Sequence, residues 1–461
     1  MSKYACVDVG TTRVKLAIYD ESFARVHSEH TTIPLSPDGL HDPEAVYATV
    51  RQMLKKGKEL GATSAGLATY RASVLAWKKD GTPLTPIVTW LNSDSRRAYE
   101  KLPAHIKALA RIPPFDLIIS PYSPLVRLLF LRETNPKTAP LLRSADAMAW
   151  TLESYLVQRL TGRFVSDATS ATLTGLIHPK SLKPIGIVKS LLKIDIPIPE
   201  VVGNAEPVGT AEGLELKALA ADQQVACLAE GVVGGKAAKV TNGTGTFVDV
   251  PTDGYTSVKG LVPIVILKLK NSTFYGLEGY LPSSGKAVEL MFDLGVLRNY
   301  SELENPPAEP HVHVIPALAG LQVPRVPEAK GLFYGITAAT NRGSILSGLL
   351  DSIAFHVRLV LETSQRKVEA IRANGNLSQS TELLKRISAV TGLPVERQAD
   401  LEGTMKGLAL LQAISEDRLR LEDAGSTRRG VEVIDERGKD RRDGAYREWT
   451  SLAESLRSFR I

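Results

Sequence analysis

Residues 7–20 read Val-Asp-Val-Gly-Thr-Thr-Arg-Val-Lys-Leu-Ala-Ile-Tyr-Asp, and the clearest structural signal of the chain lies here. Apolar residues before and after the turn at residues 10–12 predict two strands joined as a hairpin. Gly10 lets the backbone approach a ligand closely. The N–H groups and threonine hydroxyls at the tip can bind phosphate oxygens. A plain hairpin turn is the alternative for this pattern on its own.

Charged residues flank the turn. Arg13 and Lys15 follow it and can add positive charge beside a phosphate. Asp8 precedes it, where a carboxylate could hold a hydrated Mg²⁺ ion. The stretch therefore predicts a site for a phosphate group and its magnesium ion.

The same pattern recurs about half a chain later. Residues 240–250 read Val-Thr-Asn-Gly-Thr-Gly-Thr-Phe-Val-Asp-Val, again with an apolar entry, a glycine and threonine turn, and an apolar exit. Two such hairpins, one opening each half, predict two similar domains with a nucleotide between them. We expect the domains to span residues 1–232 and 233–461. The glycine-rich residues 231–235 are the expected hinge, since glycines tolerate large backbone changes.

Composition excludes several classes of protein. The chain has 461 residues, of which 43% are hydrophobic, as in ordinary globular domains. Its strongly apolar run at residues 261–267 is too short to cross a bilayer, and no signal peptide is visible, so we expect a cytoplasmic protein. Cys6 and Cys227 lie in apolar segments and are expected to be reduced core residues. The net charge of +6 suits an anionic substrate, and no basic and aromatic interleaving indicates nucleic-acid binding.

Other phosphate-binding motifs and a metal cluster are not supported. Gly235-Lys236 and Gly285-Lys286 are each followed by alanine, so neither is a P-loop. No Gly-x-Gly-x-x-Gly after a strand indicates a Rossmann site. His311 and His313 have no cysteine or acidic partner in register, which disfavours a metal site there.

Asp222 is the sharpest single candidate for chemistry. It lies in Leu219-Ala-Ala-Asp-Gln-Gln-Val-Ala-Cys-Leu, which is otherwise largely apolar and is expected to begin a helix. A carboxylate at such a position is often an N-cap. The alternative to an N-cap is a carboxylate that takes part in chemistry.

Several motifs, in order along residues 4–411, resemble the FGGY family of sugar kinases. They are the two hairpins, the segment Asp222-Gln223-Gln224, residues 335–342 with the helix after them, and residues 372–378. The resemblance implies an α/β protein of two actin- and hexokinase-like (ribonuclease H-like) domains, with ATP bound in the cleft between them. The Asp-Gln-Gln segment and the second hairpin are most similar to glycerol kinases.

The resemblance also implies roles for individual residues. Asp222 would be the general base, Gln223 would contact the substrate, and Phe247 would pack on it. Asp8 and Asp222 would hold Mg²⁺. The residues expected to bind ATP are Gly10, Thr11, Thr12, Arg13, Lys15, Gly243, Thr244, Gly245, Thr246, Asn374, Gly375, Asn376 and Ser378.

The chain departs from the family pattern in its substrate site and in its adenosine motif, among other places. Glycerol kinases bind the hydroxyls of their substrate with an Arg-Glu pair, but here Arg71 is followed by Ala72. Tyr122 lies near the position of the family's substrate-binding tyrosine. Loss of one carboxylate acceptor removes up to about 1.5–3 kcal/mol of charge-assisted hydrogen bonding. This indicates a larger or differently hydroxylated substrate, unless a neighbour such as Ser73 takes over. In the adenosine motif, Asn374 and Asn376 stand where the family has an acid and a second glycine.

Three functions remain open on the sequence alone. The leading one is ATP-dependent phosphorylation of a small polyol or sugar, with glycerol converted to glycerol 3-phosphate as the first choice. A kinase of a ketopentose such as xylulose or ribulose is the second. A non-catalytic, actin-type nucleotide-binding protein is the third. Expected partners are the substrate and ATP, without nucleic acid or membrane, and a homodimer stays open.

Overall fold

The computed structural model describes residues 2–110, 112, 115–121, 123–134, 140, 147–192, 194, 196–304, 306 and 311–458. The chain forms two compact units. The first comprises Met1–Gly231, Ile264–Phe274 and Gly403–Thr427, and the second Val232–Pro263, Tyr275–Glu402 and Arg428–Ile461. The expected division at residues 232 and 233 therefore needs a correction, because two later segments pack with the first unit. One of them is tied there by Asn204, whose backbone N–H donates to the carbonyl of Lys268 (2.7 Å).

The main sheet of the first unit has the order β11-β12-β5-β1-β2-β3. Its strands are β1 (Tyr4–Val9), β2 (Arg13–Tyr19), β3 (Arg25–Thr32), β5 (Ser64–Thr69), β11 (Thr210–Ala211) and β12 (Leu214–Ala221). Strands β12, β5 and β1 run parallel, and β2 returns antiparallel to β1 through the predicted hairpin. Every residue of β1 and β5 is buried, as is typical of central strands covered on both faces. The covering helices include α1 (Pro43–Glu59) and α14 (Gly403–Ser415).

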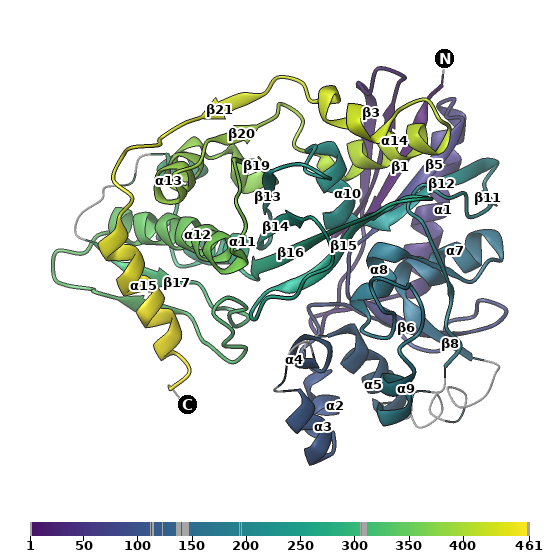
Figure 1. Ribbon diagram of the computed structural model, residues 1–461, viewed down its shortest axis with the longest axis horizontal. Coiled ribbons are helices and arrows are strands. Elements are labelled where there is room, and N and C mark those ends of the chain that lie inside the picture. Colours follow the sequence, from purple (N-terminus) through teal and green to yellow (C-terminus); the bar gives the residue numbers. More distant parts are fainter. Residues whose placement is uncertain are drawn as a thin grey trace. The chain divides into compact units, whose positions relative to one another are not determined.

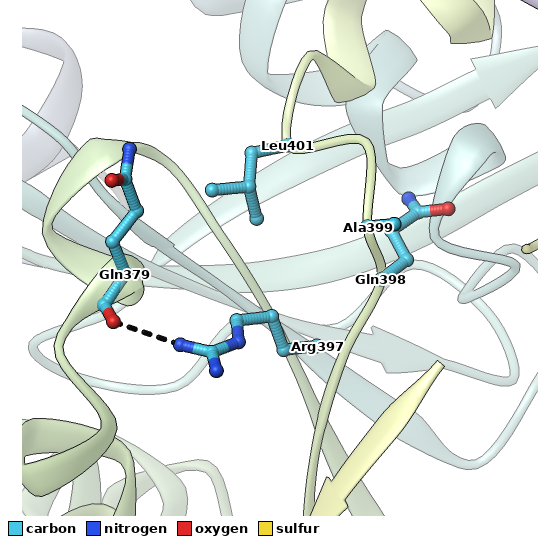
Figure 2. Close-up of a pocket in the computed structure, with 5 residues that line it drawn as sticks. All are labelled: Gln379, Arg397, Gln398, Ala399 and Leu401. Atoms are coloured by element: carbon cyan, nitrogen blue, oxygen red, sulfur yellow. Dashed lines mark hydrogen bonds between the residues drawn. The ribbon is translucent and has the colours of Figure 1, made fainter. Parts of the chain in front are cut away.

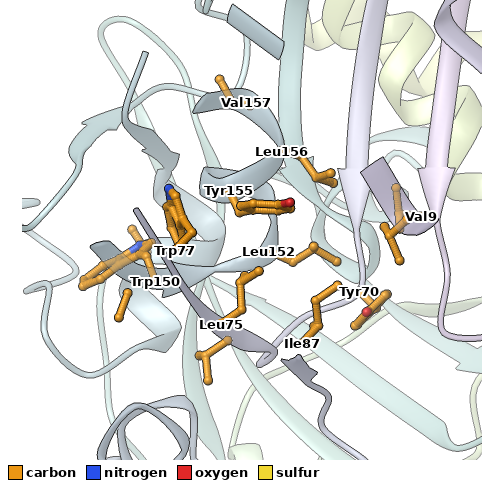
Figure 3. Close-up of a cluster of buried hydrophobic side chains, with 14 of the residues drawn as sticks. Val9, Tyr70, Leu75, Trp77, Ile87, Trp150, Leu152, Tyr155, Leu156 and Val157 are labelled. Carbon is orange, nitrogen blue, oxygen red and sulfur yellow. The ribbon is translucent and has the colours of Figure 1, made fainter. Parts of the chain in front are cut away.

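A second, smaller sheet in the first unit has the order β4-β7-β6-β8. Its strands are β4 (Leu40–His41), β6 (Val74–Lys78), β7 (Ile87–Val88) and β8 (Ala147–Thr151). Figure 3 shows the buried hydrophobic cluster to which this sheet contributes Leu75, Trp77, Ile87 and Trp150. In this cluster the ring centroids of Trp77 and Tyr155 lie 5.5 Å apart. The remaining elements of this unit are α2 (Arg96–Glu100), α3 (Ala104–Leu109), α4 (Phe115–Ile118), α5 (Pro124–Thr134), α7 (Leu152–Thr161), β9 (Val165–Asp167), α8 (Ala168–Leu173), α9 (Gly186–Leu192), β10 (Glu200–Val202), α10 (Asp222–Ala229) and η3 (Leu421–Thr427).

The second unit is built around strands β16 to β21 of a sheet of order β15-β16-β14-β13-β19-β20-β21 (Figure 1). Its strands are β13 (Ala237–Asn242), β14 (Thr246–Thr252), β15 (Val262–Lys268), β16 (Thr273–Leu281), β19 (Ala370–Asn374), β20 (Val395–Arg397) and β21 (Glu432–Ile434). Most residues of the edge strand β15 are grouped with the first unit. Strands β13, β19 and β20 are parallel, and β14 returns antiparallel to β13. The unit also contains α11 (Ser284–Asp293), η1 (Tyr300–Leu303), β17 (His313–Ile315), β18 (Leu332–Tyr334), α12 (Arg342–Ser364), η2 (Asn376–Gln379), α13 (Thr381–Thr391) and α15 (Asp443–Ser455).

Helix α12 is the long core helix of the second unit. Its 23 residues are long and apolar enough to cross a membrane by length and composition, yet 78% of its most apolar window is buried inside the protein. A buried core helix meets the same criterion. Its N-terminus carries a capping box in which Asn341 and Ser344 satisfy each other's backbone N–H groups.

Candidate active site

Three parallel strands of the first unit end at the same edge of its sheet. Val9 of β1 is paired with Thr69 of β5, which is paired with Ala221 of β12. The first hairpin, Arg71 and Asp222 follow these strand ends directly. The carboxyl edge of an α/β sheet is where ligands usually bind. The register of the sheet therefore brings together three sequence-predicted elements that are far apart in the chain.

The first hairpin is closed by a backbone hydrogen bond from Gly10 to the carbonyl of Arg13 (2.9 Å). Thr12 and Arg13 are exposed at its tip. Below the tip, Asp8 stands opposite Lys15 in the β1–β2 register. The Trp90 indole donates to the hydroxyl of Thr11 (3.2 Å), which ties the tip to the loop after β7.

The hairpin of the second unit also carries a charged pair, farther from its tip. Lys239 stands opposite Asp249, and their buried side chains form an ion pair (2.8 Å). The carbonyl of Thr244, at the tip, accepts from the backbone N–H of Gly285 in the first turn of α11 (3.0 Å). A side chain at Gly245 would place its Cβ 2.8 Å from the carbonyl oxygens of residues 281 and 282, so this turn requires glycine.

The predicted adenosine motif lies beside that second hairpin. Asn242 donates from its side chain to the hydroxyl of Ser378 (3.0 Å), and Ser378 donates to the carbonyl of Asn374 (2.6 Å). Gly375 has a φ of +84°, and a Cβ there would lie 2.5 Å from the carbonyl oxygen of Asn242. This contact explains why the first glycine of the motif is kept although its neighbours are asparagines.

A pocket of about 270 Å³ opens next to this motif, after the end of β20 (Figure 2). Arg397 forms one wall, and its Nη1 donates to the carbonyls of Ser378 and Gln379 (2.9 Å each). The lining residues are Gln379, Arg397, Gln398, Ala399 and Leu401. Our sequence analysis did not single them out. The feature that could have indicated them is their position after β20, which runs parallel to β19.

Asp222 is the first residue of α10 and not its N-cap. Strand β12 continues to Ala221, so the helix expected from Leu219 begins three residues later. Ala221 occupies the cap position, and the Asp222 carboxylate accepts from the N–H of Gln223 (2.8 Å). A carboxylate in the first turn is stabilised by the helix dipole.

Arg71 faces Asp222 across the strand ends. Its Nε lies 4.0 Å from Asp222 Oδ1, with side chains 11% and 24% exposed. The pair is therefore partly buried yet still reachable from solvent. A general base must be within reach of the proton that it takes, and this exposure allows that.

Models of both halves of one family match the chain in order. The N-terminal domain of the FGGY family of carbohydrate kinases matches residues 3–213, and its C-terminal domain matches residues 238–416. The chain belongs to the FGGY family of carbohydrate kinases. It is therefore an ATP-dependent kinase of a sugar or polyol.

Relatives of this FGGY kinase align over most of their length. A protein described as an uncharacterized sugar kinase from Archaeoglobus fulgidus is 30% identical over 453 residues, 88% of this chain and 90% of that one. The glycerol kinase of Arabidopsis thaliana is 27% identical and covers 87% of both chains.

Solved structures show the same fold. Plasmodium falciparum glycerol kinase with ADP superposes with a TM-score of 0.87 at 21% identity, over 99% of this chain and 98% of that one. The xylulose kinase of Lactobacillus acidophilus superposes with a TM-score of 0.85 at 18% identity, over 99% and 98%. The expected two-domain α/β fold is confirmed.

The turn after β5, which holds Arg71 and Ala72, has an unusual backbone conformation. Ala72 has a φ of 61°, in the left-handed region that non-glycine residues rarely adopt. Ser73 is buried, and its hydroxyl donates to the carbonyl of Arg71 (3.4 Å), so it is used within the turn. Tyr122 lies outside the described residues. Phe247 belongs to the second unit, where it stacks on Tyr280 with centroids 5.4 Å apart; its packing on a substrate stays a prediction.

The residues expected to hold magnesium suit that ion. Asp8 is the next-to-last residue of β1 and Asp222 follows β12, and β5 lies between these two strands in the sheet of the first unit. Among the described residues no group of three or more His, Cys, Asp or Glu side chains could hold a metal ion. Mg²⁺ at kinase sites usually takes one or two carboxylates, with waters and substrate phosphates as the other ligands. Two carboxylates therefore fit magnesium better than a metal that needs a full protein cage.

Proposed function

We propose that this FGGY kinase transfers the γ-phosphoryl group of ATP to a hydroxyl of a small polyol, with glycerol as the first candidate and glycerol 3-phosphate as its product. The observation that carries the proposal is the Arg71–Asp222 pair at the carboxyl edge of the first sheet, beside the Gly10 hairpin. It combines a base for a hydroxyl, a cation beside it and a phosphate-binding turn.

Asp222 accepts the proton of the attacking hydroxyl in this proposal. Arg71 lies beside the carboxylate and can donate to a second hydroxyl of the acceptor, which would orient it. Phosphoryl transfer depends mainly on positioning and on donors around the transferred group. The backbone N–H groups at the tips of the two hairpins are suited to supply such donors.

Asp8 and Asp222 would hold Mg²⁺ through their carboxylates. When bound, the ion would supply positive charge that offsets the charge of the phosphates. Residues 243–246 and 374–378 of the second unit would bind the rest of the nucleotide. The hydrogen bond between Asn242 and Ser378, which joins these two segments, supports that assignment.

A ketopentose is the second candidate acceptor because of Ala72. The missing carboxylate frees room beside Arg71 for additional carbons and hydroxyls. A site whose polar groups bind a particular substrate hydroxyl strongly rejects analogues that lack this hydroxyl. Xylulose and ribulose are therefore the alternatives to glycerol.

A panel of acceptors tests the proposal. ADP release from ATP and Mg²⁺ is measured with glycerol, erythritol, xylulose and ribulose, and without acceptor. We expect acceptor-dependent ADP release that is greatest for glycerol. A ketopentose with the highest kcat/KM would replace glycerol by the second candidate. ADP release that no acceptor stimulates would contradict the proposed substrate class and favour a nucleotide switch.

A further inference from the structure

A buried arginine contacts the turn that holds Arg71 and Ala72. Arg127, on α5, is 1% exposed. Its Nη1 donates to the carbonyl of Ala72 (3.1 Å) and its Nη2 to the carbonyl of Trp90 (3.0 Å). One guanidinium therefore joins two loops that are not adjacent in sequence.

The two carbonyls belong to residues that matter for the site. Ala72 has the left-handed φ of 61° and follows Arg71, the partner of Asp222. Trp90 donates from its indole to Thr11 at the tip of the first hairpin (3.2 Å). Arg127 thus contacts the turn at Ala72 directly, and it is connected to the first hairpin through Trp90.

The physical argument concerns strain and desolvation. A left-handed alanine persists only where its surroundings hold it. A guanidinium that is removed from water needs acceptors in fixed directions, and its planar fork suits two carbonyls at once. The interaction therefore constrains both loops together.

We infer that Arg127 is a positioning residue, which fixes the turn at Ala72 so that Arg71 points toward Asp222 and which holds Trp90 against Thr11. The inference rests on the proposed function for its kinetic consequences only. Arg127 is buried and bonds to the backbone beside Arg71, so its effect should appear through Arg71.

The experiment compares three variants in α5. Arg127→Met keeps the length of the side chain and removes its donors. Arg127→Lys keeps a charge and can donate to one or both carbonyls. Leu129→Ala, at a residue 2% exposed in the same helix, removes packing without touching either loop's hydrogen bonds and serves as the control.

For Arg127→Met we expect kcat/KM for the best acceptor of the panel to fall about 10- to 100-fold, because small misplacements at an active site are costly. The KM for ATP should change less. Arg127→Lys should recover part of the loss. Leu129→Ala should lower the melting temperature but leave kcat/KM close to wild type.

A second readout does not depend on activity. Trp90 is half-buried, and its emission is obtained by subtracting the spectrum of a matched Trp90→Phe variant. Arg127→Met should shift this emission, and Leu129→Ala should not. If wild type phosphorylates no acceptor, the proposed substrate class fails while this readout still decides the role of Arg127. Unchanged Trp90 emission, or equal kinetic losses in Leu129→Ala and Arg127→Met, would overturn the inference.

Discussion

At the scale of single residues, the proposed site for the acceptor depends on two side chains, those of Arg71 and Asp222. Asp222 and Arg71 lie close together only because two parallel strands end in register. Both side chains retain some exposure, so changes to them need not disturb the core.

Asp222→Asn should lower kcat about 10²- to 10⁴-fold, as loss of a general base typically does. The asparagine oxygen can still accept from Gln223, so the start of α10 should hold. ATP binding should stay near wild type by calorimetry. Asp20→Asn removes a similar charge at a local turn and is the control. Near wild-type turnover in Asp222→Asn would remove this residue from the mechanism.

Ala72→Glu should raise the preference for glycerol over xylulose by roughly tenfold, because it restores a charged acceptor beside Arg71 worth about 1.5–3 kcal/mol. Alanine already adopts the left-handed φ, so glutamate adds little backbone strain. The measurement is the ratio of kcat/KM values for the two acceptors. Ala72→Gln, which adds the same bulk without charge, is the control. If glycerol is already preferred and Ala72→Glu leaves the ratio unchanged, Ala72 has no bearing on specificity.

At the scale of elements, each unit presents one hairpin whose tip is stabilised by backbone contacts. The carbonyl of Thr12 accepts from Ile33, and that of Thr244 from Gly285 (3.0 Å each). Both threonines are exposed, so their hydroxyls can reach a ligand.

Thr12→Val and Thr244→Val should each weaken ATP binding or turnover by roughly 1–2 kcal/mol, because a hydroxyl donor is lost while the backbone contacts remain. Melting temperatures should be unchanged. Thr246→Val is the contrasting variant: its buried hydroxyl bonds to Asn242 (2.9 Å) and Ser284 (2.8 Å), so stability should fall as well. Wild-type ATP kinetics in both tip variants would reduce the hairpins to plain turns.

At the scale of the whole molecule, the two units use the same plan. Each places its hairpin and its other predicted ligand-binding loops after parallel strands of one sheet. The stability of each unit rests on its own core. The first unit also buries two carboxylates, those of Glu153 and Asp167.

Glu153 should make the stability of the first unit depend on pH. Burial, and then the nearby charge of Asp167, raise the pKa of Glu153 to about 7. A carboxyl with a raised pKa contributes most when protonated, at low pH, and that contribution is lost as pH rises from about 4.5 to about 7. Glu153→Gln should therefore be more stable than wild type at pH 8, by on the order of 1–3 kcal/mol, with little difference near pH 5.

Urea unfolding of this variant and wild type at several pH values checks that expectation. The glutamine oxygen can still accept from Thr151 (2.5 Å) and Ser166 (2.6 Å). Glu59→Gln, at an exposed side chain, is the control and should show no such trend. A stability difference that is the same at every pH would show that Glu153 does not titrate on folding in this range.

The sequence by itself determined the two hairpins, the glycine-dependent turns and the family. These features are local, since a few consecutive residues specify a tight turn between two apolar strands. The motif order along the chain then identified a two-domain kinase. The start of α10 was misplaced because the apolar residues 219–221 suit a strand end as well as a helix.

Only the tertiary structure decided which distant residues meet. The pairing of Arg71 with Asp222, the contacts of Arg127 with two loops, and the pocket at Arg397 depend on strand register and helix packing. The packing of residues 264–274 and 403–427 with the first unit has the same origin. Such contacts join segments separated by tens to hundreds of residues, and no local pattern carries them. They form because many buried side chains and paired strands satisfy one arrangement together.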